Sequence, residues 1–260
     1  MSVLTNAGGW ILVADDNAVN QRLAILLLEN AGYGVDAVND GAEAVEAVTR
    51  RRYDAVLMDC EMPVLDGYAA ASEIRRREAG AGRIPIIAVI ASAMVGDAER
   101  AIAAGMDAHV TKPLDRQELH VTLARLLSGE GPTAARLLRQ RSGQVEGVDQ
   151  GALDQLAGID GTGEALRALV KLFLRDAPMK LEALADAIAR RDATSVHATA
   201  HSLKGSAATL GQRRLAQLIG RIEGEASEDK LPDPDEVHRL RAALDEAMAR
   251  LLAIIEDLPG

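Results

Sequence analysis

Aromatic residues and cysteine are scarce in this sequence. Its 260 residues include one tryptophan, three tyrosines and one phenylalanine, too few for the stacking surfaces that bind single-stranded nucleic acid. The formal net charge of −10 also opposes binding to a phosphate backbone. The single cysteine, Cys60, excludes an internal disulfide and a cysteine metal cluster, and it suits a reducing compartment. We therefore expect no direct contact with nucleic acid.

Long apolar runs are missing as well. No uninterrupted apolar stretch reaches the roughly 18 residues that a membrane span needs. The opening stretch MSVLTNAGGW has neither the basic region nor the apolar core of a signal peptide. We therefore expect no membrane insertion and a cytoplasmic location. The 48% of hydrophobic residues still suffices for the cores of one large domain or two ordinary ones.

The two halves of the chain differ in their hydrophobic pattern. In residues 9–128, short apolar runs such as WILVAD, DAVLMD and PIIAVI alternate with helical patterns. Apolar strands separated by helices predict an α/β, doubly wound, five-stranded parallel sheet. In residues 149–257 the apolar positions repeat at helical spacing, which predicts a separate all-α four-helix bundle. Residues 129–148, with four Gly, one Pro and one Ser, are the expected linker, although AARLLRQR within them is compatible with a brief helix.

Charged residues end three of the expected strands. VADD closes the first with Asp15 and Asp16, VLMD closes the third with Asp59, and VTKPL brings Lys112 after the fifth. The carboxyl ends of parallel strands meet at one edge, so the three carboxylates would repel one another unless a cation compensates. Mg²⁺ suits such oxygen ligands, and a lysine suits a phosphoryl oxygen. Taken singly, each aspartate is equally compatible with a helix N-cap, but the set favours a site for phosphate on a carboxylate.

These segments, ILVADDNAVNQ, LMDCEMPVLDG, PIIAVIASAM and VTKPL, together resemble the receiver domain of two-component response regulators. The resemblance implies a flavodoxin-like fold with Asp59 as the phosphoacceptor. It further implies that Asp15, Asp16 and Asp59 hold Mg²⁺, and that Lys112 contacts the phosphoryl group. The bond between Lys112 and Pro113 is expected to be cis, as is common in this family.

Two positions depart from the receiver pattern. Ile90 ends the fourth expected strand, where family members usually carry a Thr or Ser hydroxyl, and His109 stands where a switching aromatic residue is usual. An isoleucine cannot hydrogen-bond a phosphoryl oxygen. We therefore expect Asp59 to accept phosphate while the usual surface rearrangement is weakened.

The second half carries the stretch HATAHSLKGSAATLG, in which a glycine interrupts a helical pattern. A glycine inside a helix costs about 1 kcal/mol relative to alanine, so its position needs a reason. Asp192 is the expected N-cap of this helix and Gly211 its expected end. Helical spacing puts His197, His201, Lys204 and Gly205 on the face opposite the apolar residues. We expect His201 to face solvent, where its short neighbours let a partner protein reach the imidazole.

The segment AHSLKGSAATLG resembles the phosphorylated-helix motif of histidine phosphotransfer (HPt) domains. The resemblance covers residues 149–257 and implies His201 as a phosphoacceptor, with Lys204 one turn along steadying the phosphate. Two alternatives stay open. His197 and His201 could share a metal ion, although their helical face offers no carboxylate or thiol, and His201 could be an ordinary solvated histidine.

Together these features predict a cytoplasmic phosphorelay protein that passes phosphoryl groups between Asp59 and His201. Its expected partners are a sensor or hybrid histidine kinase upstream and a response-regulator receiver downstream. No Gly-rich nucleotide-binding motif occurs, so we expect the chain to have no ATP-dependent kinase activity of its own. Two other functions stay open, namely a non-switching receiver that serves as a docking module with only His201 active, and the C-terminal tail of a hybrid histidine kinase.

Overall fold

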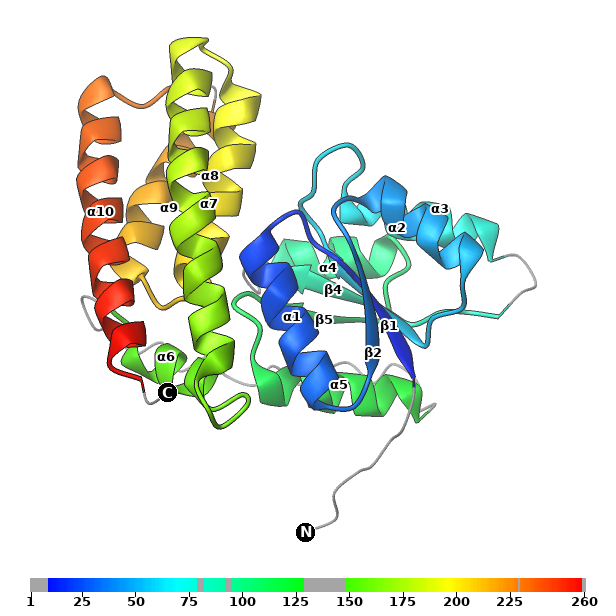
Figure 1. The fold of residues 1–260 in the computed structure, drawn as a ribbon. Coiled ribbons are helices and arrows are strands. Elements are labelled where there is room, and N and C mark those ends of the chain that lie inside the picture. Colours follow the sequence, from blue (N-terminus) through cyan, green and yellow to red (C-terminus); the bar gives the residue numbers. More distant parts are fainter. Residues whose placement is uncertain (1–8, 79–81, 92–94, 129–147, 229, 259–260) are drawn as a thin grey trace. The chain divides into compact units, whose positions relative to one another are not determined.

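A computed structural model describes residues 9–78, 82–91, 95–128, 148–228 and 230–258. These residues form two compact units, one within residues 1–141 and the other within 142–260. Figure 1 draws both, and each is described here by itself. Of the predicted linker only Val148 is described, so the brief helix suggested for AARLLRQR lies outside the described residues.

The first unit is the predicted α/β domain. Its sheet has five parallel strands in the described residues, in the order β2-β1-β3-β4-β5. The strands are β1 (Trp10–Ala14), β2 (Gly34–Val38), β3 (Ala55–Asp59), β4 (Ile86–Ile90) and β5 (Ala108–Thr111). The helices between and after them are α1 (Ala18–Asn30), α2 (Gly41–Arg50), α3 (Gly67–Arg77), α4 (Val95–Ala103) and α5 (Arg116–Leu127). The prediction of a doubly wound sheet is confirmed.

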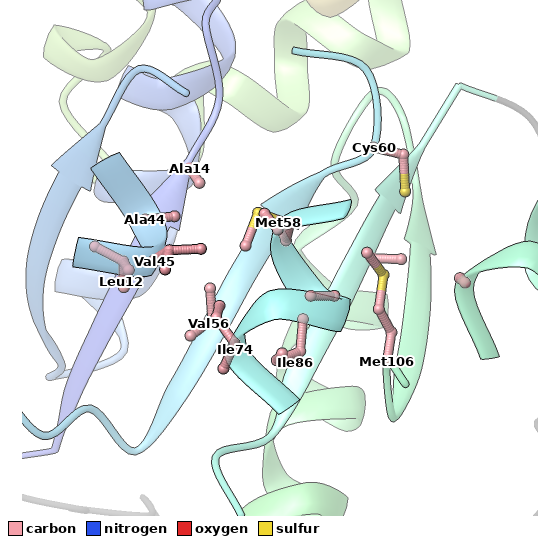
Figure 2. Close-up of a cluster of buried hydrophobic side chains, with 14 of the residues drawn as sticks. Leu12, Ala14, Ala44, Val45, Val56, Met58, Cys60, Ile74, Ile86 and Met106 are labelled. Carbon is pink, nitrogen blue, oxygen red and sulfur yellow. The ribbon is translucent and has the colours of Figure 1, made fainter. Parts of the chain in front are cut away.

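The core of this unit explains why the sheet is parallel. Every residue of β3 and β4 is buried, as expected for central strands that are covered on both faces. On one face, side chains from β1, β3 and β4 pack against residues of α2 and α3, and Figure 2 shows Met58 and Ile86 among them. This packing fixes the strands in register, so that their carboxyl ends meet along one edge.

The second unit is helical, as predicted. It consists of α6 (Gln150–Ala157), α7 (Glu164–Ala189), α8 (Ala193–Thr209), α9 (Arg213–Ser227) and α10 (Pro234–Glu256). The four longer helices pack as a bundle. Helix α8 contacts α7 and α9, and α10 contacts the same two helices. Figure 1 shows these helices running side by side. The core includes Phe173, Leu203 and Leu251, all fully buried. None of the described helices has the length and apolar content that a membrane crossing requires.

Both ends of α8 are where the sequence predicts them. At its start the Asp192 side chain accepts a hydrogen bond of 3.0 Å from the Ser195 backbone N–H. Beyond its end Gly211 has a φ of +66°, and a Cβ there would lie 2.8 Å from the Asp149 carbonyl oxygen. The Asp149 N–H donates to the Gly211 carbonyl at 2.8 Å, and Val148 pairs with Gln212 in an isolated bridge. The first residues of this unit are thereby fastened to the end of α8.

Candidate functional site

The carboxylates predicted in the first unit converge at the carboxyl ends of β1 and β3. The register pairs Ala14 with Met58, so Asp15, which follows β1, lies beside Asp59, which ends β3. Oxygens of Asp15, Asp16 and Asp59 all lie within 4.8 Å of one another. Because β1 and β3 flank the point where the strand order reverses, this is where doubly wound sheets bind ligands.

Two of these carboxylates are almost inaccessible. Asp15 is 5% exposed and Asp59 is 2% exposed. Backbone N–H groups hold them in place, since Asn17 donates to Asp15 Oδ1 at 2.9 Å and Glu61 donates to Asp59 Oδ1 at 3.2 Å. Three acidic groups at this distance suit a divalent cation with oxygen ligands.

Lys112 completes this cluster from the end of β5. Its Nζ lies 2.5 Å from Asp59 Oδ2 and 3.4 Å from Asp15 Oδ2. Burial by itself lowers the pKa of Lys112, but the carboxylates of Asp15 and Asp59 raise that pKa by more, so the ammonium stays charged. The Lys112–Pro113 bond is cis, as predicted. The lysine is therefore a fixed cation directly beside Asp59.

The two departures from the receiver pattern also have defined places. Ile90 is 2% exposed and packs in the hydrophobic cluster that includes Met58 and Met106. Its backbone carbonyl accepts the Lys112 N–H at 2.8 Å. His109 lies in β5 with a partly buried side chain. The end of β4 therefore presents an apolar side chain where a hydroxyl would have been a hydrogen-bond donor.

His201 lies in the middle of α8, but the expectation that it faces open solvent is wrong. The residue is 8% exposed, and its Nδ1 lies 2.7 Å from Glu223 Oε1 on α9. The helical periodicity of α8 did not reveal this contact because Glu223 belongs to the next helix. The sequence did hold one indication of a buried polar contact. Glu223 lies on the apolar face of α9, which also carries Ile219, Ile222 and Ala226.

Glu223 also joins His201 to Lys204. Lys204 Nζ lies 2.5 Å from Glu223 Oε2, so both carboxylate oxygens are engaged. Burial raises the pKa of Glu223, but hydrogen bonds from His201 and Lys204 lower it by more, so the pKa of this carboxyl group lies below its ordinary value. A carboxylate at Nδ1 favours the tautomer with the proton on that nitrogen. Nε2 is then the nucleophilic nitrogen of the ring.

The neighbouring histidine is where helical spacing predicts it. The rings of His197 and His201 have centroids 6.4 Å apart and planes 15° from parallel. Gly205, one turn after His201, is partly buried. His197 is thus a stacked neighbour of His201 on the same helix.

Comparison with known proteins assigns a family to both units. The family model described as "Response regulator receiver domain" matches residues 11–124, and the model described as "Hpt domain" matches residues 168–253. The order of the two units defines a class, a receiver followed by a histidine phosphotransfer module. The chain therefore carries a receiver domain and, after it, an HPt domain.

The relatives include a sensor protein and a histidine kinase. The chain is 30% identical over 264 residues to sensor protein GacS of Pseudomonas syringae pv. syringae, which covers 96% of this chain and 28% of that protein. It is 38% identical over 150 residues to histidine kinase 1 of Arabidopsis thaliana, covering 45% of this chain and 12% of that protein. The chain therefore spans a small part of these relatives.

A solved structure matches the first unit. It is the receiver domain of a sensor histidine kinase from Pseudomonas aeruginosa, with magnesium coordinated in its active-site cleft. The two are 48% identical, the match covers 47% of this chain and 99% of that one, and the TM-score is 0.44.

Proposed function

We propose that this chain passes a phosphoryl group between Asp59 and His201, receiving it from a sensor or hybrid histidine kinase and delivering it to a downstream receiver. The observation that carries the proposal is the arrangement at His201, where Glu223 holds Nδ1 at 2.7 Å and so makes Nε2 the nucleophile. The proposed boundaries are residues 9–128 for the receiver, 129–148 for the linker and 149–257 for the phosphotransfer domain. A cytoplasmic location fits the single cysteine.

The carboxylate cluster supports Asp59 as the second acceptor. Asp15, Asp16 and Asp59 are the residues that would hold Mg²⁺, since their oxygens lie within 4.8 Å of one another. When bound, the ion neutralises negative charge on the phosphoryl oxygens. Lys112, which lies 2.5 Å from Asp59, binds a phosphoryl oxygen as a point charge.

Transfer of the phosphoryl group from aspartate to His201 requires no net transfer of a proton. The lone pair of His201 Nε2 attacks phosphorus, the N–P bond forms, and the bond from phosphorus to the aspartyl oxygen breaks. The carboxylate leaves with the electron pair. The ring thereby gains positive charge while its proton stays on Nδ1, where Glu223 stabilises it. The reverse step regenerates the aspartyl phosphate.

An acetyl phosphate assay tests this proposal. Purified protein is incubated with acetyl phosphate and Mg²⁺, and acid-labile phosphohistidine is separated from base-labile aspartyl phosphate. Asp59→Asn is expected to lose both labels, whereas His201→Gln keeps the aspartyl phosphate alone. Labelling of His201 that persists undiminished in Asp59→Asn would contradict the transfer and favour the docking-module reading of the receiver.

A second candidate places the same modules at the end of a larger protein. It is favoured by GacS, a sensor protein in which this chain matches 28% of the length. Under our main proposal the chain has no kinase core of its own and depends on a separate kinase for ATP. An antibody against the HPt domain tests this, because the endogenous polypeptide has the size of this chain in one case and of a complete kinase in the other.

A further inference from the structure

A second lysine contacts the residue that follows His201 in α8. Lys180 on α7 donates a hydrogen bond of 2.7 Å from Nζ to Ser202 Oγ. Ser202 follows His201 directly in α8 and is 7% exposed. The ammonium group of Lys180 is therefore held next to the residue that we propose to carry phosphate.

Helix geometry places Lys180 and Lys204 on the two flanks of His201. At about 100° per residue, Lys204 lies roughly 60° from His201 in the direction of α9, and Ser202 lies about 100° away in the direction of α7. Gly205 lies about 40° from His201 on the side of Ser202. Because this glycine has no side chain, position 205 places none between the His201 ring and the Lys180 ammonium, which gives a reason for a glycine within α8.

Charge balance requires a cation on that side. A phosphoryl group on Nε2 brings close to two negative charges into a site that already holds the Glu223 carboxylate. Lys204 is bonded to that carboxylate at 2.5 Å, so its charge is largely offset before any phosphate arrives. An ammonium group has three N–H donors. Lys180 can thus keep Ser202 as one partner and donate to a phosphoryl oxygen with another N–H.

We propose that Lys180 is a phosphoryl-binding residue of the histidine site and stabilises phosphohistidine at position 201. This proposal rests on the proposed function, in which His201 is the acceptor. A nearby cation favours the dianionic form of a phosphoryl group. Lys180 therefore lowers the pKa of the phosphoryl group on His201.

Phosphorus NMR of the full chain tests this directly. An Asp59→Asn background prevents aspartyl phosphate, phosphoramidate phosphorylates the imidazole chemically, and the ³¹P resonance is followed against pH. Replacing Lys180 with glutamine is expected to raise the phosphoryl pKa by roughly 0.7, the value for one unit charge about 4 Å away in water. Lys180→Arg keeps the lower pKa. The matched control is Lys171→Gln. Lys171 is exposed and lies on the opposite face of α7 from Lys180, so its replacement should leave the phosphoryl pKa unchanged.

Further variants separate the possible failures. If Lys180→Gln titrates like Lys171→Gln, Lys180 does not bind the phosphoryl group. If Lys180→Gln fails to fold, Ser202→Ala decides, because it removes the hydroxyl and leaves the ammonium group, so the pKa should stay low. A rise of the pKa in Ser202→Ala overturns the proposal by assigning the effect to the hydroxyl. If His201→Gln retains the resonance, the acceptor assignment, and with it the proposed function, is wrong.

Discussion

Replacing Ile90 with threonine would restore the hydroxyl that the end of β4 lacks. The register pairs Asp59 with Val89, so residue 90 extends one position beyond the level of Asp59. A hydrogen bond from this hydroxyl to a phosphoryl oxygen is worth about 1.5–3 kcal/mol, which is roughly ten- to a hundredfold in a two-state equilibrium. We expect the wild-type receiver to accept phosphate with little change of shape, and Ile90→Thr to couple phosphorylation to movement of α4.

The same substitution has a cost that can be measured separately. Ile90 is 2% exposed within an apolar cluster, so a shorter side chain with a polar atom lowers the free energy of unfolding by about 2 kcal/mol. Ile86→Thr is the matched control. Ile86 is fully buried in the same cluster, but it pairs with Val56 at the far end of the strand from Asp59. Urea denaturation of both variants measures this cost.

Hydrogen exchange of α4 (Val95–Ala103) reads out the coupling. The difference between phosphorylated and unphosphorylated protein should be small in the wild type and in Ile86→Thr, and should grow at least tenfold in Ile90→Thr. A large phosphorylation-dependent difference in the wild type would refute the reasoning, because Ile90 would then be no impediment. Equal behaviour of the two threonine variants would refute it as well.

Three further substitutions test the remaining contacts. Glu223→Gln should slow phosphoryl transfer to His201 roughly a hundredfold in single-turnover assays, because a neutral amide stabilises the ring's positive charge poorly. The pKa of Glu223 in the folded protein lies below its ordinary value of 4.5, so the stability that Glu223 contributes is complete above pH 4.5 and is lost as the pH falls through the folded pKa. In urea denaturation between about pH 6 and about pH 3, the stability advantage of the wild type over Glu223→Gln should therefore shrink as the pH falls. Arg75→Ala should lower the free energy of unfolding by about 3 kcal/mol, because Arg75 is 13% exposed and bonds Asp107 at 2.6 Å, whereas the exposed Arg76→Ala should change it by under about 0.5 kcal/mol. Burial, and then a hydrogen bond to Asp36, raises the pKa of Tyr53 from its ordinary value of 10.0 to about 12. The stability linked to this raised pKa is complete below pH 10 and is lost as the pH rises through 12. Thermal unfolding at alkaline pH should therefore show a loss of stability over this range in the wild type that Tyr53→Phe lacks.

The carboxylate cluster could be predicted from the sequence because a topological rule places it. Once the apolar runs indicated parallel strands, the ends of those strands had to meet. Asp59 ends one of them, and Asp15 and Lys112 follow two others. The caps of α8 were equally accessible, since an N-cap aspartate and a left-handed glycine act locally. The roles of these residues in phosphoryl transfer stay predictions.

The contacts between helices could not be predicted in the same way. Periodicity indicates which face of a helix is buried, but it does not fix how far one helix is shifted along its neighbour. Glu223 meets His201 from α9, and Lys180 meets Ser202 from α7, each through packing of residues about twenty positions apart in the chain. The expected exposure of His201 was wrong for this reason, because a helical wheel of α8 contains nothing of α9.

The fastening of Val148 and Asp149 to the end of α8 sets the length of a tether. His201 lies eight residues before Thr209, the last residue of α8, and Gly211 lies two residues further on, so the attachment point is roughly 15 Å from the backbone of His201. The chain between Ser128 and Val148 can extend to at most about 70 Å. Confinement of one receiver within that radius corresponds to a concentration in the millimolar range. A separate receiver present at micromolar concentration is therefore at a disadvantage of roughly a thousandfold in encountering this histidine, unless its own affinity for the HPt domain makes up the difference.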